Sequence, residues 1–226
     1  MTGSHRAPLS RRDPSRTRVR RLPEKQVESA EVRDAILAAG IVAHLAVVDK
    51  GQPFVLPVAY APWRDRLAFH GSTGSRLFRM LADGAPTCLT VTLVDGLVLA
   101  RSAFESSMNY RGVMVLGRCS VVTGQDKDDA LATITEHLLP GRWDTIRHPS
   151  KKEDAATTVL SLTLDEWSVK VGEGFAEDPE EDLAPDTYGG VWAGRVPIVT
   201  SFGTPEPDAF STGLAVPEYV GDWRHR

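Results

Sequence analysis

Alternating apolar and polar residues between residues 41 and 122 predict a series of closely spaced β-strands. The strand-like segments are residues 41–48, 53–60, 66–70, 87–94, 97–100 and 112–122. Asp95-Gly96, between two of these apolar runs, predicts a β-hairpin turn. Two further strands are expected at residues 157–164 and 167–171. Strands at this density favour a small antiparallel barrel.

Helical periodicity is confined to a few segments. It predicts helices over residues 25–39, 77–83 and 126–139, and a short helical turn at residues 151–156. Gly40 and Gly84 follow the first two helices as natural stops, and Pro140-Gly141 ends the third. The sequence therefore predicts a mainly β fold with flanking helices.

Two prolines interrupt the strand expected at residues 53–60. Because Pro has no backbone N–H, Pro53 and Pro57 favour an edge strand or a bulge at Pro57. A bulged strand exposes N–H and C=O groups that a planar heterocycle can use, whereas an ordinary edge strand has no such role. The residues alone leave both interpretations open.

The segment HGSTGSR, residues 70–76, joins a predicted strand to a predicted helix. It combines two glycines, three hydroxyl side chains and one guanidinium, next to the unpaired backbone N–H groups of a helix start. Such donors are typical of a phosphate site. The same residues also suit an ordinary junction in which Ser or Thr caps the helix.

A second polar segment, RSAFESSMNYR, covers residues 101–111. It carries two arginines and many hydrogen-bonding side chains, yet it lies between apolar strands. We expect a loop held by rigid elements, which is where binding sites tend to occur.

The net charge of −4 hides an uneven distribution. Residues 1–25 hold seven Arg and one Lys against two acidic residues, whereas residues 173–186 hold seven acidic residues and no basic ones. We expect a disordered basic arm at residues 1–22, a folded domain at residues 23–203 and a loose tail at residues 204–226. The arm has no interleaved aromatic residues, so little supports nucleic-acid binding.

Several other classes of protein find little support. No segment approaches the roughly 18 apolar residues of a membrane span, and the N-terminus lacks the apolar core of a signal peptide. Cys88 and Cys119 lie in apolar runs and are expected to be free thiols of a cytoplasmic protein. The six His have no spacing typical of a metal site, so no metal is predicted.

Four segments together resemble the flavin-nucleotide-binding proteins of the pyridoxamine 5′-phosphate oxidase-like group, and its Nim-type nitroimidazole reductase branch in particular. They are HGSTGSR (70–76), VDGLVLARSAFESSMNYR (94–111), PGRWDTIR (140–147) and VWAGRVP (191–197). The resemblance covers about residues 25–200. It implies a six-stranded antiparallel Greek-key split β-barrel and a homodimer with FMN bound at the subunit interface.

The resemblance also implies roles for individual residues. The FMN phosphate would be held by Ser72, Thr73, Ser75 and Arg76, with His70 and Gly71 at the ribityl chain or ring edge. The ring would be lined by backbone atoms of Leu56, Pro57, Val58 and Tyr60, and from the facing side by Met108, Asn109, Tyr110 and Arg111, with Trp192 packed nearby. Without the resemblance, Trp192 suits a core position, Met108 a packing role and Arg111 a surface ion pair.

The chain departs from the family pattern at two places. Gly172 stands in Lys170-Val171-Gly172 where an Arg is expected, and the residues that bind the vitamin phosphate in true pyridoxamine 5′-phosphate oxidases are not identifiable. Vitamin B6 oxidation is therefore not expected.

These inferences lead to one functional hypothesis and two alternatives. The hypothesis is an FMN-dependent oxidoreductase that passes hydride or electrons to a small nitroaromatic or quinone acceptor, with NADH or NADPH as candidate donor. His70 is the candidate acid acting on the substrate. The alternatives are a non-catalytic flavin-binding or regulatory protein, and the same barrel using deazaflavin F420 or heme.

Overall fold

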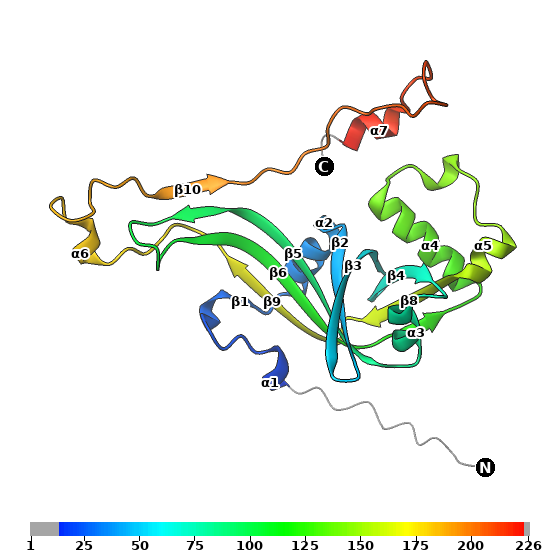
Figure 1. The fold of residues 1–226 in the computed structure, drawn as a ribbon, viewed down its shortest axis with the longest axis horizontal. Helices are drawn as coiled ribbons and strands as arrows, with labels where there is room; N and C mark the ends of the chain where they lie inside the picture. Colours follow the sequence, from blue (N-terminus) through cyan, green and yellow to red (C-terminus); the bar gives the residue numbers. More distant parts are fainter. Residues whose placement is uncertain (1–13, 224–226) are drawn as a thin grey trace, which may run out of the picture.

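The computed structural model describes residues 14–223, which form one antiparallel sheet with helices packed around it (Figure 1). Neighbouring strands follow the order β1-β9-β6-β5-β2-β3-β4-β8-β7, and β10 pairs with β5. The strands are β1 (Gln26–Val27), β2 (Val42–Asp49), β3 (Gln52–Trp63), β4 (Arg66–Ser72), β5 (Pro86–Leu99), β6 (Ser107–Arg118), β7 (Ser120–Val122), β8 (Thr157–Thr163), β9 (Glu166–Gly172) and β10 (Gly194–Pro197). The predicted mainly β architecture with flanking helices is confirmed.

The helices are α1 (Pro14–Thr17), α2 (Ala30–Ala39), α3 (Arg76–Ala82), α4 (Gln125–Leu138), α5 (Lys151–Ala156), α6 (Glu180–Leu183) and α7 (Glu218–Asp222), with single 3₁₀ turns at Pro23–Lys25 and Trp143–Thr145. The first predicted helix begins five residues later than residue 25, because Gln26 and Val27 pair with β9. Ser29 caps α2 by accepting a hydrogen bond from the Val32 backbone N–H. None of the helices in residues 14–223 is long and apolar enough to cross a membrane.

Two apolar clusters lie on opposite faces of β3 and β4. Tyr60 and Phe69 belong to the larger cluster, which α2 and α3 cover. Trp63 and Ala68 face the other way and pack under α4. This follows from the alternation of side chains along a strand. The two clusters fix β3 and β4 between helices on both sides.

The hairpin predicted at Asp95-Gly96 is wrong. β5 continues through these residues, and β6 pairs with it on both sides of a bulge: Val94 lies opposite Tyr110, and Gly96 lies opposite Asn109. A β-bulge and a hairpin turn use the same small polar residues, and here long-range pairing with β6 decides between them. The chain reverses instead between β5 and β6, so residues 107–111 of the predicted loop belong to a strand.

β3 changes partners along its length, and this creates a split in the sheet. Residues 52–59 pair only with β2, whereas residues 60–63 pair with β4. Beyond Phe69, β4 pairs only with β8. Within residues 14–223, the second edge of residues 53–59 and the second edge of residues 70–72 are therefore left unpaired by strands. The predicted edge position of residues 53–60 is confirmed over most of its length, but the register with β2 continues through Pro57 without a bulge.

The described part of the basic arm, residues 14–22, follows β9 of the same chain. The Arg16 guanidinium lies 3.4 Å from the Glu166 carboxylate. The Lys170 ammonium donates a hydrogen bond to the Arg21 backbone carbonyl at 3.2 Å. Residues 1–13 of the predicted arm lie outside the described residues.

The C-terminal segment returns from β10 to the far side of the molecule, where α7 lies next to the connection that follows α4 (Figure 1). There the Trp223 indole N–H donates to the Pro140 carbonyl at 3.0 Å, and Arg142 donates to the Tyr219 hydroxyl at 2.9 Å. The segment predicted to be a loose tail thus contains an anchored helix, while its last three residues lie outside the described range.

Candidate functional site

The split between β3 and β4 brings together two of the predicted site segments. Leu56, Pro57 and Val58 lie on the part of β3 that pairs only with β2, and Leu56 and Pro57 are exposed. His70 and Ser72 lie on the part of β4 that has left β3. Backbone groups on such free edges can pair with a ligand in place of a neighbouring strand.

The turn after β4 is built by short-range hydrogen bonds. The Ser75 backbone N–H donates to the Ser72 carbonyl at 2.9 Å, and the Gly74 N–H donates to the Ser72 hydroxyl at 3.2 Å. Ser75 caps α3 by accepting from the Phe78 N–H, and the Thr73 N–H is taken by Ala156. Since these two serine hydroxyls act as acceptors, their hydrogens remain able to donate to an anion.

Arg76 is held at the edge of this turn. Its guanidinium stacks over the Phe54 ring at 4.0 Å from the ring centre, and one nitrogen lies 3.6 Å from the Asp49 carboxylate. The side chain is still 59% exposed. The contact with Phe54 places this cation beside the free edge of β3, where it can pair with a phosphate.

Gly71 and Tyr60 have structural roles here. A Cβ on Gly71 would lie 2.4 Å from the buried Phe78 ring, so only glycine allows this packing. The Tyr60 side chain is fully buried, and its hydroxyl donates to the Leu37 carbonyl at 2.7 Å. Burial raises the pKa of Tyr60 above its ordinary value. The side chains of both residues therefore belong to the core rather than to the split.

His70 keeps an exposed ring surface next to the split. Desolvation by neighbouring atoms lowers the pKa of His70 below its ordinary value. Its ring has no hydrogen-bond partner among residues 14–223. A neutral imidazole predominates at neutral pH as a result, and this weakens the predicted role as a proton donor. The neutral His70 ring also has one nitrogen lone pair that can accept a hydrogen bond or bind a metal ion.

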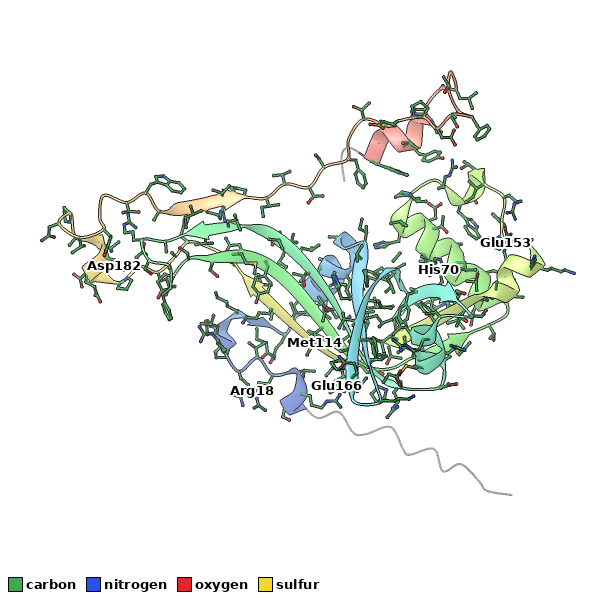
Figure 2. The ribbon with its side chains drawn as sticks, in the orientation of Figure 1. Arg18, His70, Met114, Glu153, Glu166 and Asp182 are labelled. Atoms are coloured by element: carbon green, nitrogen blue, oxygen red, sulfur yellow. The ribbon has the colours of Figure 1, made fainter. Side chains whose placement is uncertain are left out.

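The residues predicted to face the ring from the other side lie at the opposite end of the sheet. Figure 2 shows His70 near α4 and Asp182, on α6, at the far end of the long β5–β6 ribbon. Met108 to Arg111 lie in β6 at that far end. Within one chain, the structure does not bring them to the split.

The four residues from Met108 to Arg111 also do not share one face of the sheet. Met108 and Tyr110 point to one face of the sheet, and Asn109 and Arg111 point to the other. Arg111 donates two hydrogen bonds to the Asp95 carboxylate, at 2.9 and 2.7 Å, and this pairing raises the pKa of Arg111. The ion pair that the sequence alone allows for Arg111 is thus present, with the bulge residue as partner.

Trp192 precedes β10 and is 65% exposed rather than in the core. Its ring lies over Gly194, where an added Cβ would be only 2.8 Å from the indole. Two residues that the sequence analysis did not propose as site residues, Asp95 and Arg195, line a pocket of about 240 Å³ with Asn109, Arg111 and Gly172. Arg195 is the one charged residue of the VWAGRVP segment, and this could have marked it as a candidate.

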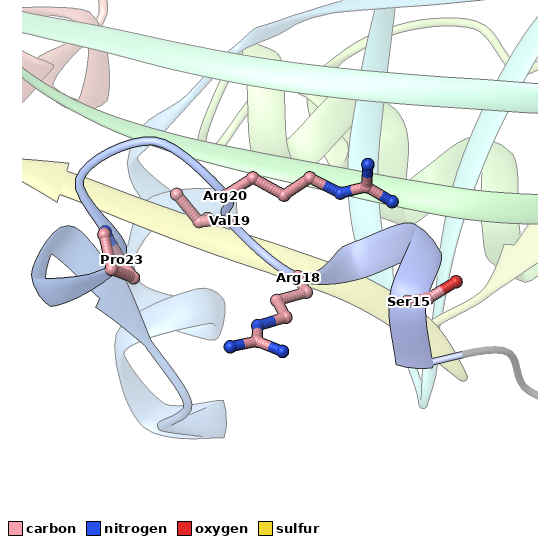
Figure 3. A pocket seen from close by; sticks show the side chains of 5 residues that line it. All are labelled: Ser15, Arg18, Val19, Arg20 and Pro23. Carbon is pink, nitrogen blue, oxygen red and sulfur yellow. The ribbon is translucent and has the colours of Figure 1, made fainter.

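A hollow of about 340 Å³ on the basic arm has the wrong geometry for an anion site. Figure 3 shows that the Arg18 and Arg20 side chains on its wall point in different directions. Their charges do not converge on one position, as an anion site requires.

Residues 29–171 match the pyridoxamine 5′-phosphate oxidase family. The match covers more than half of the chain, and the chain belongs to this pyridoxamine 5′-phosphate oxidase-like family. The resemblance seen in the four sequence segments is confirmed at this level. No curated protein was found to match the chain.

Two solved structures are similar over most of the chain. The FAD and heme binding protein from Mycobacterium smegmatis is 38% identical, with a TM-score of 0.84, and the match covers 88% of this chain and 97% of that one. The flavocytochrome Anf3 from Azotobacter vinelandii is also 38% identical, with a TM-score of 0.84, over 92% of this chain and 96% of that one.

A more distant structure shares the fold. A candidate 5-nitroimidazole antibiotic resistance protein from Bacteroides thetaiotaomicron is 21% identical with a TM-score of 0.53, and the match covers 65% of this chain and 86% of that one. The split-barrel architecture is therefore common to all three similar structures.

Proposed function

We propose that this protein is a flavin-dependent oxidoreductase that holds its flavin in the split between β3 and β4. The observation that carries the proposal is the free edge of β3 beside a turn with exposed hydroxyls and the Arg76 guanidinium. Two structures 38% identical to this chain are a FAD and heme binding protein and a flavocytochrome, which supports a flavin as the ligand.

The residues of the split suit the parts of a flavin nucleotide. Backbone groups of Leu56, Pro57 and Val58 would pair with the polar edge of the ring. A phosphate would be held by Ser72, Thr73, Ser75 and Arg76. We propose FMN, because a single terminal phosphate matches this single set of donors. FAD is the alternative, and chromatography of the extracted flavin distinguishes the two.

A bound flavin supplies hydride or single-electron transfer, and the chain supplies orientation and exclusion of water. We propose a small nitroaromatic or quinone acceptor and NADH or NADPH as donor. The exposed position of Leu56 and Pro57 leaves room for a second small molecule over a ring bound there.

The test is an absorption spectrum of the purified protein, followed by anaerobic reduction. We expect flavin bands that bleach with NADH or NADPH and return when a quinone or nitroaromatic is added. A colourless protein that does not bind added FMN or FAD would overturn the proposal. Bands that bleach with dithionite but never return on adding acceptors would leave only the non-catalytic flavin-binding alternative.

A flavocytochrome is the second candidate, favoured by the two structures that are 38% identical. A heme iron needs an axial ligand, and neutral His70 offers a nitrogen lone pair at the split. His44, exposed on β2, is the matched comparison. If heme is present, His70→Ala should abolish the Soret band of the purified protein and His44→Ala should preserve it. The reverse result would move the ligand to β2.

We also propose a homodimer. Leu97 lies opposite Met108 on one side and Val196 on the other, so the three side chains share one face, together with Leu99. We call these four residues the distal patch; each is between 38% and 50% exposed. Adjoining exposed apolar side chains of this kind mark protein interfaces. Sedimentation analysis of the purified protein tests the dimer.

We also propose that the protein is cytoplasmic. Cys88 and Cys119 are both free thiols, which suits a reducing compartment. Burial raises the pKa of the Cys119 thiol to about 12, so this group stays protonated and unreactive at neutral pH.

A further inference from the structure

We propose that the pocket between β6 and β10 binds the carboxylate of a small aromatic acid, with Arg195 as the recognising cation. The pocket lies at the end of the sheet away from the β3–β4 split. The inference goes beyond the flavin proposal and does not depend on it.

The pocket exists because of the bulge in β5. The extra residue, Asp95, has no partner in the ladder with β6 and is turned toward Arg111. Its backbone carbonyl also accepts a hydrogen bond from the Ile198 N–H at 3.0 Å, just after β10. β6 and β10 are thereby held on either side of the bulge, and the pocket lies between them.

Arg195 is the cation of this pocket that is not already held by a carboxylate. Asp95 and Arg111 neutralise one another in a two-bond pair, at 2.9 and 2.7 Å. Arg195 makes no ion pair within residues 14–223, and its guanidinium carbon lies 5.6 Å from the centre of the Phe175 ring. Its planar set of donors is therefore free to take a carboxylate through two parallel hydrogen bonds.

The base of the pocket supplies a polar end and an apolar side. Asn109 is 6% exposed; its amide N–H donates to the Gly174 carbonyl at 2.9 Å, while its oxygen has no partner among the described residues. Val171 lines the pocket on the same face as Arg111. The 71% exposed Phe175 ring lies beside Arg195. An aromatic ring bearing one charged group matches these surfaces.

Size and charge narrow the ligand class further. The volume of about 240 Å³ restricts the pocket to one small molecule. Glu173 also lines the pocket, so a doubly charged phosphate would meet a carboxylate as well as Arg195. A singly charged carboxylate is repelled less by Glu173 than a doubly charged phosphate is.

The pocket and the distal patch face opposite ways. Arg195 lies opposite Val98, which is 6% exposed, whereas its neighbour Val196 lies opposite Leu97 in the patch. Because alternate residues point to opposite faces, a partner that covers the patch leaves Arg195 uncovered on the other side.

The experiment is a ligand-observed NMR titration of the protein as purified, with benzoate as probe and benzamide and inorganic phosphate as comparisons. We expect benzoate to bind, benzamide to bind at least tenfold more weakly, and phosphate not to displace benzoate. Arg195→Gln should weaken benzoate at least tenfold, as expected for loss of a hydrogen-bonded charge. Arg195→Lys, which keeps the charge but not the planar fork, should give an intermediate value.

Arg18→Gln is the control, because Arg18 is an exposed arginine of the arm away from this pocket. It should leave benzoate affinity unchanged. Flavin absorbance recorded on the same samples separates this test from the flavin proposal. The inference is overturned if benzoate does not bind, if Arg195→Gln binds it as well as the unmodified chain does, or if phosphate competes equally.

Discussion

The β3–β4 split and the distal end of the β5–β6 ribbon are built in different ways. Most hydrogen bonds of the turn at the split join residues two to four positions apart, such as Gly74 to Ser72, and one joins Thr73 to Ala156. At the distal end, Arg101 bonds Asp178 across 77 positions and Asn109 bonds Gly174 across 65. Local sequence determines the first region, whereas distant segments must meet to form the second.

The two regions also use their charges differently. At the split, Arg76 is 59% exposed and the turn hydroxyls face solvent, so these groups can still engage a ligand. At the distal end, the Asp178 side chain is 4% exposed and already bound by Arg101. This ion pair anchors residues 173–186 to the loop between β5 and β6. The difference implies that mutations of the turn alter binding at the split, while mutations of the Arg101–Asp178 pair alter local order at the distal end.

The largest effect is expected from a charge placed in the distal patch. Leu97→Lys should raise the dissociation constant of the proposed dimer at least a hundredfold, because an unpaired buried charge costs about 3–5 kcal/mol. Sedimentation velocity over a range of concentrations measures it. Val121→Lys, at an equally exposed apolar position on β7, should have no such effect. An unchanged dimer in Leu97→Lys would show that the patch is not the interface.

The next effect concerns binding at the split. Arg76→Ala should weaken flavin binding by about 1.5–3 kcal/mol, the range for a hydrogen bond to a charged group. Fluorescence titration of the flavin-free protein gives the affinity. Arg79→Ala, one turn along the same helix, is the control and should bind flavin normally. Equal affinities in the two variants would remove Arg76 from the phosphate site.

A third effect concerns packing beneath the split. Gly71→Ala should lower the free energy of unfolding by about 1–3 kcal/mol, because its Cβ would overlap the buried Phe78 ring. Urea unfolding measures the change. Gly74→Ala is the matched control, since its Cβ would meet only the Ser72 hydroxyl, at an ordinary 3.5 Å. If both variants are equally stable, Phe78 has room to move and the packing argument fails.

The smallest effect is local and depends on pH. The pKa of Asp178 is lowered, first by the hydrogen bond from the Arg101 backbone N–H and then by the Arg101 side chain. A carboxyl with a lowered pKa stabilises the folded state above its unfolded pKa of about 3.9, and this contribution is lost as the pH falls through the folded value. Residues 173–186 should therefore open in acid before the β3–β4 split does.

Hydrogen exchange with mass spectrometry, between pH 5 and pH 3, measures this opening. Protection relative to the intrinsic exchange rate should fall in peptides from residues 173–186, and Asp178→Asn should show low protection at both pH values. Glu180→Gln, at an exposed position of α6, should behave like the unmodified chain. Equal protection of the segment in Asp178→Asn and the unmodified chain at pH 5 would argue against this anchor.

The alternation of apolar residues was sufficient to place most strands and α4 near their observed bounds. The edge position of β3 was also predictable, because Pro53 and Pro57 cannot donate to a second neighbour. The segment from His70 to Arg76 was recognisable for a related reason: its turn, cap and cation are neighbours in sequence.

What the sequence could not show depended on distant partners. Asp95-Gly96 has the composition of a hairpin turn, and only pairing with β6 and β10 makes it a bulge. Gly71 lies in a segment with the composition of a phosphate-binding loop. The Phe78 ring, which leaves no room for a Cβ, is the better explanation for a glycine at this position. The ion pair between Asp95 and Arg111, with its two hydrogen bonds, joins residues 16 positions apart, and no local sequence pattern predicts it.

The bulge at Asp95 also reverses which alternate residues of β5 face the core. Before it, the odd-numbered Leu89 and Val91 are buried; after it, the even-numbered Val98 is buried and Leu97 and Leu99 are exposed. Losing this one residue would invert the remainder of the strand, sending leucines inward and Val98 to solvent. The length of this segment therefore matters more to folding than the identity of its residues. Single-residue insertions or deletions here should destabilise the protein more than substitutions do.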